Sequence, residues 1–271
     1  MLSATKPSQN ALQFFGFRYP PFSDTFEITT PYQSNDDTVM LDRIDALLRQ
    51  GKSVALCGEA GTGKSMLVKA ITARLDSKEY RIAQIPYGGL QPSALLRDLC
   101  DELDIDTSGR KNLLSRISAD FSRASDRPFP VIIIDEAHEM QYRSVIDLCS
   151  LLHDKRKRTA AAALILVGLP VLRKKLELDI YASIRTRLSS IFTMQKLSID
   201  SAVEFLRYRL ALVKASNIFT DEALQCLATD TKGNRRTLMN LATLCLEEAA
   251  RRSEKLITDE IVTAITLEYN R

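Results

Sequence analysis

The sequence has no tryptophan and only two histidines, His138 and His153, among its 271 residues. Its five cysteines are an odd number, and no two of them form a CxxC pair. Structural zinc sites need cysteines and histidines at short, regular spacings, so the sequence predicts no zinc site. Every cysteine lies in an apolar stretch, where a free thiol behaves as a small hydrophobic side chain, and we therefore expect a reducing compartment.

Long apolar runs are also missing. The best candidate, residues 160–167, is eight residues long, whereas a membrane-spanning helix needs about 18 apolar residues. The first ten residues, MLSATKPSQN, lack the apolar core of a signal peptide. We therefore expect a cytoplasmic protein with no membrane partner. The net charge of +3 permits binding to nucleic acid without requiring it.

What the sequence does contain is an alternation of apolar strands and helices. It predicts strands at residues 53–57, 80–86, 131–134, 163–167 and 191–197, with helices at 64–75, 92–103, 112–123 and 144–152. Strands that alternate with helices form parallel βαβ units, so we predict an α/β fold whose parallel sheet is covered on both faces. After residue 198 the pattern is helical, which predicts a small all-helical domain.

This pattern divides the chain into three parts. Residues 39–198 are expected to form the α/β domain and residues 199–271 the helical domain. Residues 1–38 contain FFGFRYPPFSDTF, whose prolines are incompatible with a long helix. We expect this N-terminal segment to be extended and to pack on the α/β domain.

The strongest local signal is GEAGTGKS at residues 58–65, which satisfies G-x-x-x-x-G-K-[ST] between an expected strand and an expected helix. In that context the glycines turn backbone N–H groups toward a phosphate chain, Lys64 reaches the β- and γ-phosphates, and the Ser65 hydroxyl holds Mg²⁺. The helix N-terminus adds partial positive charge. The residues predicted to bind the nucleotide here are Gly58, Glu59, Ala60, Gly61, Thr62, Gly63, Lys64, Ser65 and Met66.

Two carboxylates follow an apolar strand in VIIIDEAHEM, residues 131–140, and we expect this strand beside the first one. Asp135 is predicted to hold Mg²⁺ through water, and Glu136 to orient or deprotonate the water that attacks the γ-phosphate. The letters DEAH also name a helicase family, but such helicases need two nucleotide-binding domains and this chain has one glycine motif. His138 either senses the γ-phosphate or simply begins the next helix, and the sequence favours the second interpretation.

Two pairs of arginines are candidates for the same chemistry. Arg187, and after it Arg185, precedes the last expected strand, where an arginine can reach the γ-phosphate of a neighbouring subunit; a solvated helix end is the alternative. Arg235 and Arg236 in GNRRTLMN begin an expected helix, where positive charge is unfavourable unless an anion is near. One of these two is therefore predicted to face the nucleotide, with a pair of surface arginines as the alternative.

A run of basic residues follows the helix expected at 144–152, and it consists of Lys155, Arg156, Lys157 and Arg158. Such residues contact DNA phosphates without reading the base sequence, and they equally form solvated loops with no partner. No aromatic platform for base stacking lies beside them, which argues against a dedicated single-strand site. Lys174 and Lys175 are open to the same two interpretations.

These motifs resemble those of AAA+ ATPases. GEAGTGKS resembles the Walker A motif, IIIDEAHEM the Walker B motif and GNRR the sensor-2 motif, and Arg187 stands where the arginine finger falls. The finer pattern resembles the ExeA/TniB/TnsC branch, through RYPPFSDTF near the N-terminus, LVGLPVLRKKL after the fourth strand and VEFLRYRL in the helical lid. Two positions depart from it. No polar side chain stands at the sensor-1 position near Val167 and Gly168, and Arg235 replaces a common proline, which favours Arg236 as the sensor-2 residue.

The resemblance implies a P-loop AAA+ domain with a helical lid that binds ATP and Mg²⁺ and hydrolyses the ATP. Transposition regulators of the TnsC and MuB kind oligomerise on double-stranded DNA as rings or filaments, select a target and recruit a transposase, sometimes with a target-selector protein. Their DNA contacts lie on pore-facing loops, which correspond here to residues 87–97 and to the basic run. The alternative is an AAA+ switch, or a secretion- or loader-type ATPase, that acts on a protein client without coating DNA.

Overall fold

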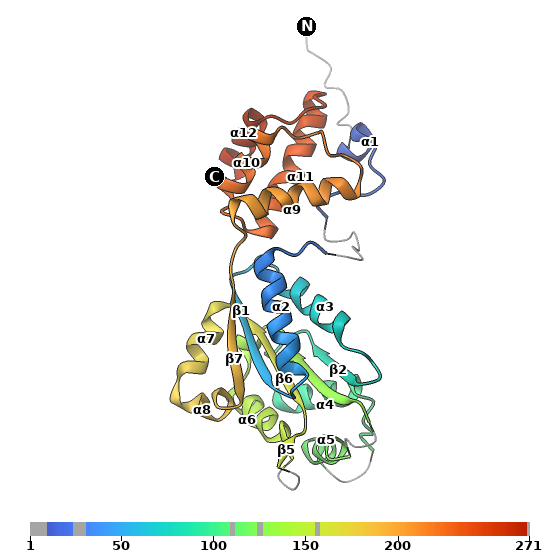
Figure 1. The fold of residues 1–271 in the computed structure, drawn as a ribbon, viewed down its shortest axis with the longest axis vertical. Helices are drawn as coiled ribbons and strands as arrows, with labels where there is room; N and C mark the ends of the chain where they lie inside the picture. The colour runs from blue at the N-terminus through green and yellow to red at the C-terminus, as the bar shows by residue number, and fades with distance from the viewer. Residues whose placement is uncertain (1–9, 24–30, 109–111, 124–126, 155–157, 270–271) are drawn as a thin grey trace. The chain divides into compact units, whose positions relative to one another are not determined.

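The structure, a computed structural model, describes residues 10–23, 31–108, 112–123, 127–154 and 158–269. The chain separates into two compact units (Figure 1). The sheet unit comprises Asn35–Ala60 and Lys64–Gln195, and the helical unit comprises Met1–Ser34, Gly61–Gly63 and Lys196–Arg271. Each unit has its own buried apolar clusters.

Five parallel strands form the sheet in the order β2-β3-β6-β1-β7. They are β1 (Ser53–Gly58), β2 (Tyr80–Ile85), β3 (Phe129–Ile134), β6 (Ala163–Gly168) and β7 (Leu188–Met194). The α/β fold with a parallel sheet is therefore confirmed. The sequence expects β3 directly beside β1, but β6 lies between them. An apolar run predicts that a strand is buried but not which strand it pairs with, because long-range pairing decides the order.

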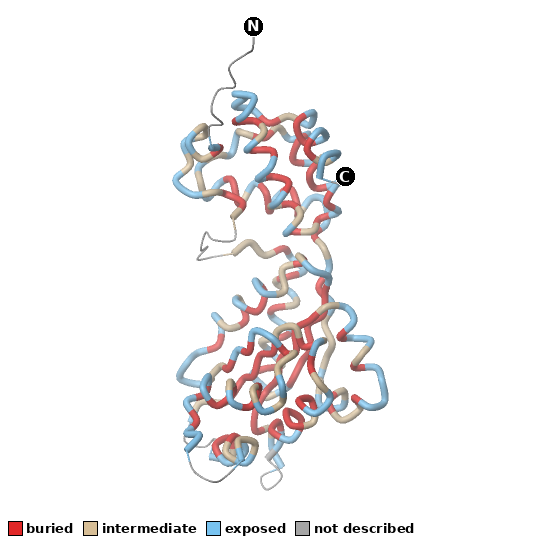
Figure 2. The backbone as a smooth tube through the Cα atoms, turned by 180° about the vertical axis from the view of Figure 1, so that it is seen from behind, coloured by how far each residue is buried: buried red, intermediate tan, exposed pale blue. Residues whose placement is uncertain are grey.

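Helices cover both faces of this sheet, and its central strands are buried (Figure 2). One face packs against α2 (Asn35–Leu48) and α3 (Lys64–Arg74), the other against α4 (Pro92–Glu102), α5 (Leu113–Phe121), α6 (Tyr142–Leu151) and α7 (Pro170–Glu177). Within β1, Val54 and Leu56 face the first pair of helices, and Ala55 and Cys57 face the others. Because both faces are buried, the strands read as continuous apolar runs.

Several short elements of the sheet unit differ from the sequence expectations. β7 covers residues 188–194 rather than 191–197, because it is an edge strand whose partly exposed residues give a weak apolar signal. Two strands of two residues, β4 (His153–Asp154) and β5 (Thr159–Ala160), pair antiparallel on either side of the basic run. Three short helical turns, η1 (Ala137–Glu139), η2 (Asp179–Tyr181) and α8 (Ala182–Arg185), are too short to show a helical period.

The helical unit is built from α9 (Ile199–Leu212), α10 (Asp221–Asp230), α11 (Arg235–Arg252) and α12 (Asp259–Tyr269). Side-chain oxygens of Ser198, Thr220 and Asn234 accept backbone N–H groups at the starts of the first three. These caps satisfy N–H groups that lack partners in the first helical turn, so short polar residues mark the helix starts. Among the described helices, none is long and apolar enough to cross a membrane.

The N-terminal segment was expected to pack on the α/β domain, but its described residues belong to the helical unit. It contains a short helix, α1 (Ala11–Phe15), which the sequence did not predict, and the Phe22 ring meets the Phe219 ring edge to face at 6.2 Å. Arg209 of α9 is buried and donates hydrogen bonds to the carbonyls of Pro21 at 2.6 Å and Ser23 at 2.8 Å. The segments PPFS and VEFLRYRL are therefore two sides of one interface.

Candidate nucleotide-binding site

The glycine loop, residues 58–65, connects β1 to α3. Gly61 and Gly63 have positive φ angles of 77° and 103°, which glycine adopts without the penalty that a side chain brings. The Lys64 ammonium donates hydrogen bonds to the carbonyls of Gly58 and Glu59, both at 2.9 Å. Ser65 is exposed in the first turn of α3. The loop thus combines a helix N-terminus, a lysine and a hydroxyl, the groups that hold a phosphate chain and its metal ion.

The remaining predicted residues of the loop differ in exposure. Glu59, Ala60 and Met66 are exposed, and Thr62 is buried. Solvent-facing residues flank a buried tip, so contacts at the tip determine how the loop is held.

The start of α11 packs on that tip, within the helical unit. Arg235 is buried, and its guanidinium donates a hydrogen bond to the Thr62 carbonyl. The Arg236 N–H donates to the Gly61 carbonyl at 3.3 Å, and the Arg236 side chain is exposed. A Cβ atom at Gly61 would lie 2.8 Å from the Arg236 Cβ, so the approach needs glycine. Because Arg235 already binds a protein carbonyl, Arg236 is the better candidate for a contact with a bound anion.

The acidic loop, residues 135–140, follows β3. The Asp135 N–H donates to the Ile85 carbonyl at 2.9 Å, and the Asp135 carbonyl accepts the Gly88 N–H at 2.8 Å. Glu136 has a left-handed backbone with φ 47° and ψ 39°, which costs a residue other than glycine roughly 1–2 kcal/mol. Its N–H donates to Asp135 Oδ1 at 2.8 Å. Strained residues of this kind persist where the surroundings hold them, and they concentrate at functional sites.

The residues predicted to hold Mg²⁺, Ser65 and Asp135, both belong to the sheet unit. Magnesium in nucleotide sites takes one or two protein oxygens and completes its shell with phosphate oxygens and water. One hydroxyl and one carboxylate fit that donor set, and the half-buried Asp135 keeps its second oxygen beyond the one that accepts the Glu136 N–H. In the described ranges no cluster of three His, Cys, Asp or Glu side chains could hold a metal ion, so phosphate oxygens and water would have to complete the shell.

His138 lies in the turn η1, as the start of a helical segment should, but its ring also contacts both neighbouring glutamates. Its Nδ1 is 3.3 Å from Glu136 Oε2, and its Nε2 is 3.4 Å from Glu139 Oε1. The same Nδ1 is 3.5 Å from the Leu169 N–H nitrogen just after β6. His138 is therefore more than a helix start, because its ring bridges the acidic loop and the end of a neighbouring strand.

The two candidate finger arginines follow α7. Arg185 is half-buried and donates to the Glu177 carbonyl at 2.6 Å, so it closes the C-terminal end of α7. Arg187 is exposed and donates to the Ser183 carbonyl at 2.6 Å. An exposed arginine held by one carbonyl can turn toward a second molecule more readily than a half-buried one, so Arg187 stays the stronger candidate.

The predicted DNA contacts are only partly covered by the structure. Lys155, Arg156 and Lys157 lie outside the described residues. Arg158 is exposed and has a left-handed backbone with φ 54°, at the edge of the β4–β5 hairpin. In the other predicted segment, Tyr87 is 48% exposed and Arg97 is exposed on α4.

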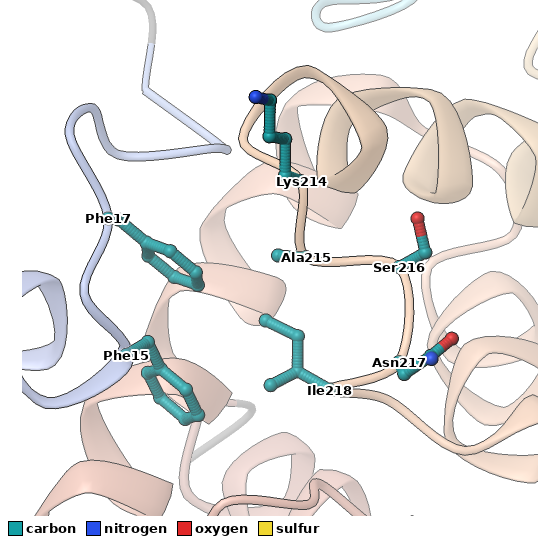
Figure 3. Close-up of a pocket in the computed structure, with 7 residues that line it drawn as sticks. All are labelled: Phe15, Phe17, Lys214, Ala215, Ser216, Asn217 and Ile218. Carbon is teal, nitrogen blue, oxygen red and sulfur yellow. The ribbon is translucent and has the colours of Figure 1, made fainter.

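A hollow of about 540 Å³ lies in the helical unit, away from these motifs in sequence (Figure 3). Phe15 and Phe17 form one side of it, with their rings stacked at 5.4 Å, and residues 214–218 form the other. None of the predicted nucleotide, metal or finger residues lines this hollow.

Comparison with known proteins agrees with the geometry of the two loops. Residues 47–176 match the model of a family described as an AAA domain. Over these residues the chain is similar to an AAA domain. The matched range includes both the glycine loop and the acidic loop, so the two motifs belong to one domain. No curated protein matches the sequence.

Solved structures share the fold over nearly the whole chain. Cdc6p from Pyrobaculum aerophilum has a TM-score of 0.70 at 16% identity, over 92% of this chain and 70% of that one. The ORC2 protein of Aeropyrum pernix in its ADPNP-ADP complexes has 0.70 at 13%, over 93% and 72%. Drosophila ORC bound to DNA has 0.68 at 16%, over 100% and 70%. These similarities confirm the P-loop AAA+ fold, and the narrower branch stays a prediction.

Some residues that hold the site were not predicted from the sequence. Gly88 comes shortly after β2 and packs closely against the acidic loop. A Cβ atom added to it would lie 2.9 Å from the Glu136 carbonyl oxygen. Lys175 donates to the carbonyls of His138 at 2.8 Å and Met140 at 2.7 Å. The Gly-Gly pair at 88–89 is a turn signal, but its contact with a loop almost fifty residues later has no local signature, and neither does the contact of Lys175.

Proposed function

We propose that this chain is a magnesium-dependent ATPase that assembles on double-stranded DNA when ATP is bound and that regulates transposition by selecting target DNA and recruiting a transposase. The observation that carries the proposal is the pair of loops within one AAA domain. The glycine loop presents Lys64 and Ser65 at the start of α3, and the acidic loop presents the strained Glu136 after β3.

In this proposal the glycine loop and Arg236 bind the phosphates of ATP, and the acidic loop acts on the water. Lys64 binds the β- and γ-phosphates, which requires it to leave the carbonyls of Gly58 and Glu59. Ser65 and Asp135 hold Mg²⁺, which supplies electrostatic stabilisation of the phosphates. Glu136 orients or deprotonates the attacking water. The neighbour described in ADPNP-ADP complexes supports nucleotide binding by this fold.

The oligomer in this proposal uses the surface around α7 and η2. Leu178 and Ile180 are 55% and 54% exposed, and Arg187 is exposed a few residues later. Exposed apolar side chains next to an arginine are typical of a protein–protein interface. An arginine from one copy would then stabilise the γ-phosphate bound by the next, so that hydrolysis depends on assembly.

DNA binding rests on charge and on similarity. The resemblance to transposition regulators, together with a neighbour described as bound to DNA, supports duplex DNA as the partner. Contacts from Lys and Arg to phosphates bring affinity without base specificity, and such binding weakens as salt rises. The segments that would carry these contacts are residues 87–97 and the basic run.

Electron microscopy of the purified protein with duplex DNA, with and without a non-hydrolysable ATP analogue, tests the proposal directly. We expect rings or filaments on DNA only when the analogue is present, and the same structures with ATP for the Glu136→Gln variant. Lys64→Ala should give neither. Raising the salt concentration should dissolve the assemblies.

Two outcomes would contradict parts of the proposal. DNA coated by Lys64→Ala in the absence of nucleotide would mean that ATP does not control assembly. ATP hydrolysis without any assembly on DNA would leave the ATPase assignment in place and favour a protein client, which affinity purification would then have to identify.

A further inference from the structure

The end of β6 lies beside the acidic loop and carries no polar side chain. β6 pairs with β3 on one side and β1 on the other, and it ends at Gly168. The glycine loop and the acidic loop follow its two neighbouring strands. A polar group at this place would stand between them, yet Val167 and Gly168 supply none.

The space left by Gly168 is filled by the ring of His138. A Cβ atom added to Gly168 would lie 3.2 Å from His138 Nδ1 and 3.1 Å from Leu172 Cδ2. The His138 side chain is only 9% exposed. A larger residue at 168 would therefore compete with the imidazole for the same space, and the glycine and the histidine fit as a pair.

The backbone of His138 is fixed from a third direction. Lys175 of α7 donates from its ammonium to the His138 carbonyl at 2.8 Å and to the Met140 carbonyl at 2.7 Å. The ammonium also lies 5.7 Å from the centre of the Tyr181 ring. Charge-assisted hydrogen bonds of this kind are among the stronger ones, and they hold the turn η1 against α7.

His138 Nδ1 has two partners that it cannot serve together. Toward the Leu169 N–H at 3.5 Å it must accept a hydrogen, and toward Glu136 Oε2 at 3.3 Å it must donate one. Nδ1 either offers a lone pair or carries a hydrogen. In the first case it accepts the Leu169 N–H, which is the hydrogen bond that the structure shows, and in the second it donates to the Glu136 carboxylate. Nε2 lies 3.4 Å from Glu139 Oε1, and it can donate to that oxygen while Nδ1 donates to Glu136 only when both ring nitrogens carry a hydrogen.

We infer that His138 is a positioning residue for Glu136, which occupies the place left empty by Gly168 and is held there by Lys175. The inference rests on the proposed function, because it assumes that Glu136 acts on the attacking water. The 3.3 Å separation lets Nδ1 exchange the Leu169 N–H for the Glu136 carboxylate, and by donating to Oε2 it would fix the orientation of that carboxylate. A small misplacement of a reacting group lowers the reaction rate. We therefore expect the His138 side chain to affect the rate of ATP hydrolysis and not the affinity for ATP.

The test measures the ATP hydrolysis rate, the Kd for a non-hydrolysable ATP analogue and the thermal midpoint of the full chain. His138→Ala should lower kcat about tenfold and leave the Kd within about twofold. In a Glu136→Gln background the same substitution should change the residual rate by less than about twofold, because a residue that acts through Glu136 has no effect once that carboxylate is gone. A purely structural role predicts equal losses in both backgrounds.

Two further variants test the pairing with Gly168 and Lys175. In His138→Ala, adding Gly168→Asn places an amide on β6 where the imidazole was, and it should restore at least part of the lost rate. Lys175→Met should lower kcat, whereas the exposed neighbour Lys174, changed to Met, should not. Lys175→Arg should keep most of the activity, because it can still donate to both carbonyls.

The results separate this inference from the proposed function. If wild-type protein hydrolyses ATP, Glu136→Gln is inactive and His138→Ala is as fast as wild type, the inference is wrong and the ATPase assignment stands. If Glu136→Gln is as fast as wild type, the proposed role of the acidic loop fails first. A change in Kd as large as the change in kcat would also overturn the inference, because it would place His138 in nucleotide binding.

Discussion

The glycine loop and the acidic loop of the same domain are held in different ways. Part of the glycine loop's geometry comes from its own residues, since Gly61 and Gly63 allow positive φ angles and Lys64 binds the carbonyls of Gly58 and Glu59. The start of α11 also binds its tip. The acidic loop is held by groups from elsewhere in the sheet unit, including Gly88, Leu169 and Lys175. The glycine loop can therefore be recognised from eight consecutive residues, whereas the contacts that hold the acidic loop cannot be recognised from its own residues.

This difference has a consequence for mutations. Changes inside the glycine loop should act directly on nucleotide binding, while changes that act on the acidic loop can lie about 30 to 50 residues away in the sequence. Matched pairs of variants can therefore separate the local contributions from the long-range ones.

The largest effect is expected for Lys64→Ala. Removing the ammonium eliminates charge-assisted contacts to the phosphates, and the Kd for an ATP analogue should rise about 100-fold or more, measured by calorimetry or with a fluorescent nucleotide. Lys69→Ala, on the exposed side of the same helix, is the control and should bind normally. Equal binding by the two variants would contradict the nucleotide role of the glycine loop.

The next effect is on hydrolysis. Glu136→Gln keeps the size of the side chain and removes the carboxylate, so ATP binding should be retained while the hydrolysis rate falls about 100-fold or more. Steady-state phosphate release, measured together with the Kd, separates the two quantities. A variant that binds ATP ten times more weakly would show that Glu136 contributes to binding, against the division of roles between the two loops.

A moderate effect on stability separates local strain from a long-range contact. Gly16 and Gly233 both have a φ of 70°, but an added Cβ at Gly16 has nothing within 4 Å, while at Gly233 it would lie 1.9 Å from the Leu197 carbonyl oxygen. Gly16→Ala should cost about 1 kcal/mol from its backbone conformation. Gly233→Ala should cost about 3 kcal/mol or more, because the chain must also move.

Urea unfolding of both glycine variants measures this difference. If the two variants lose the same stability, the close approach at Gly233 contributes nothing beyond its φ angle. That result would weaken the conclusion that long-range contacts dictate glycine positions in this chain.

The smallest effect belongs to a purely local network on α11. Hydrogen bonds from Arg251 and Arg252, at 2.6–2.7 Å, lower the pKa of Glu248 to about 2 from an ordinary 4.5. A lowered pKa stabilises the folded state above the unfolded pKa, and this contribution is lost as the pH falls through about 4.5 to about 2. Glu248→Gln should therefore be less stable than wild type by about 1 kcal/mol at pH 7.

The same difference should shrink toward zero as the pH approaches 2, and chemical unfolding across this range measures it. Glu254→Gln, an exposed neighbour, serves as control and should match wild type throughout. A Glu248→Gln deficit that stays constant down to pH 2 would assign the effect to packing and not to charge.

How much of the site could be predicted depended on the sequence separation of the interacting residues. The motif at 58–65 lies where a strand meets a helix, as expected from its glycines and its lysine, and the carboxylates lie at the end of β3. His138 lies near Glu136, two residues away, and also near Gly168 and Leu169, some thirty residues later in the sequence. The interpretation of His138 as a mere helix start missed these contacts. The roles of all these residues in catalysis remain predictions.

The N-terminal segment shows the same limit. Its prolines predicted that no long helix would form, and the helix in the described residues 10–23 is the short α1. The prolines carried no information on which unit the segment packs against. Arg209 holds the segment on the helical unit, because its guanidinium donates hydrogen bonds to the carbonyls of Pro21 and Ser23, nearly 190 residues earlier in the sequence.

Local sequence was enough to specify the elements and the chemistry that adjacent residues carry. Apolar runs made strands, capping residues began helices, and a short glycine motif specified a loop, because each depends on dihedral preferences and on neighbours within a few residues. Tertiary packing was needed to place β6 between β1 and β3, to seat the aromatic segment on the helical unit, and to gather His138, Gly168 and Lys175 around Glu136. These choices depend on packing and hydrogen bonds between distant residues, which local patterns do not encode.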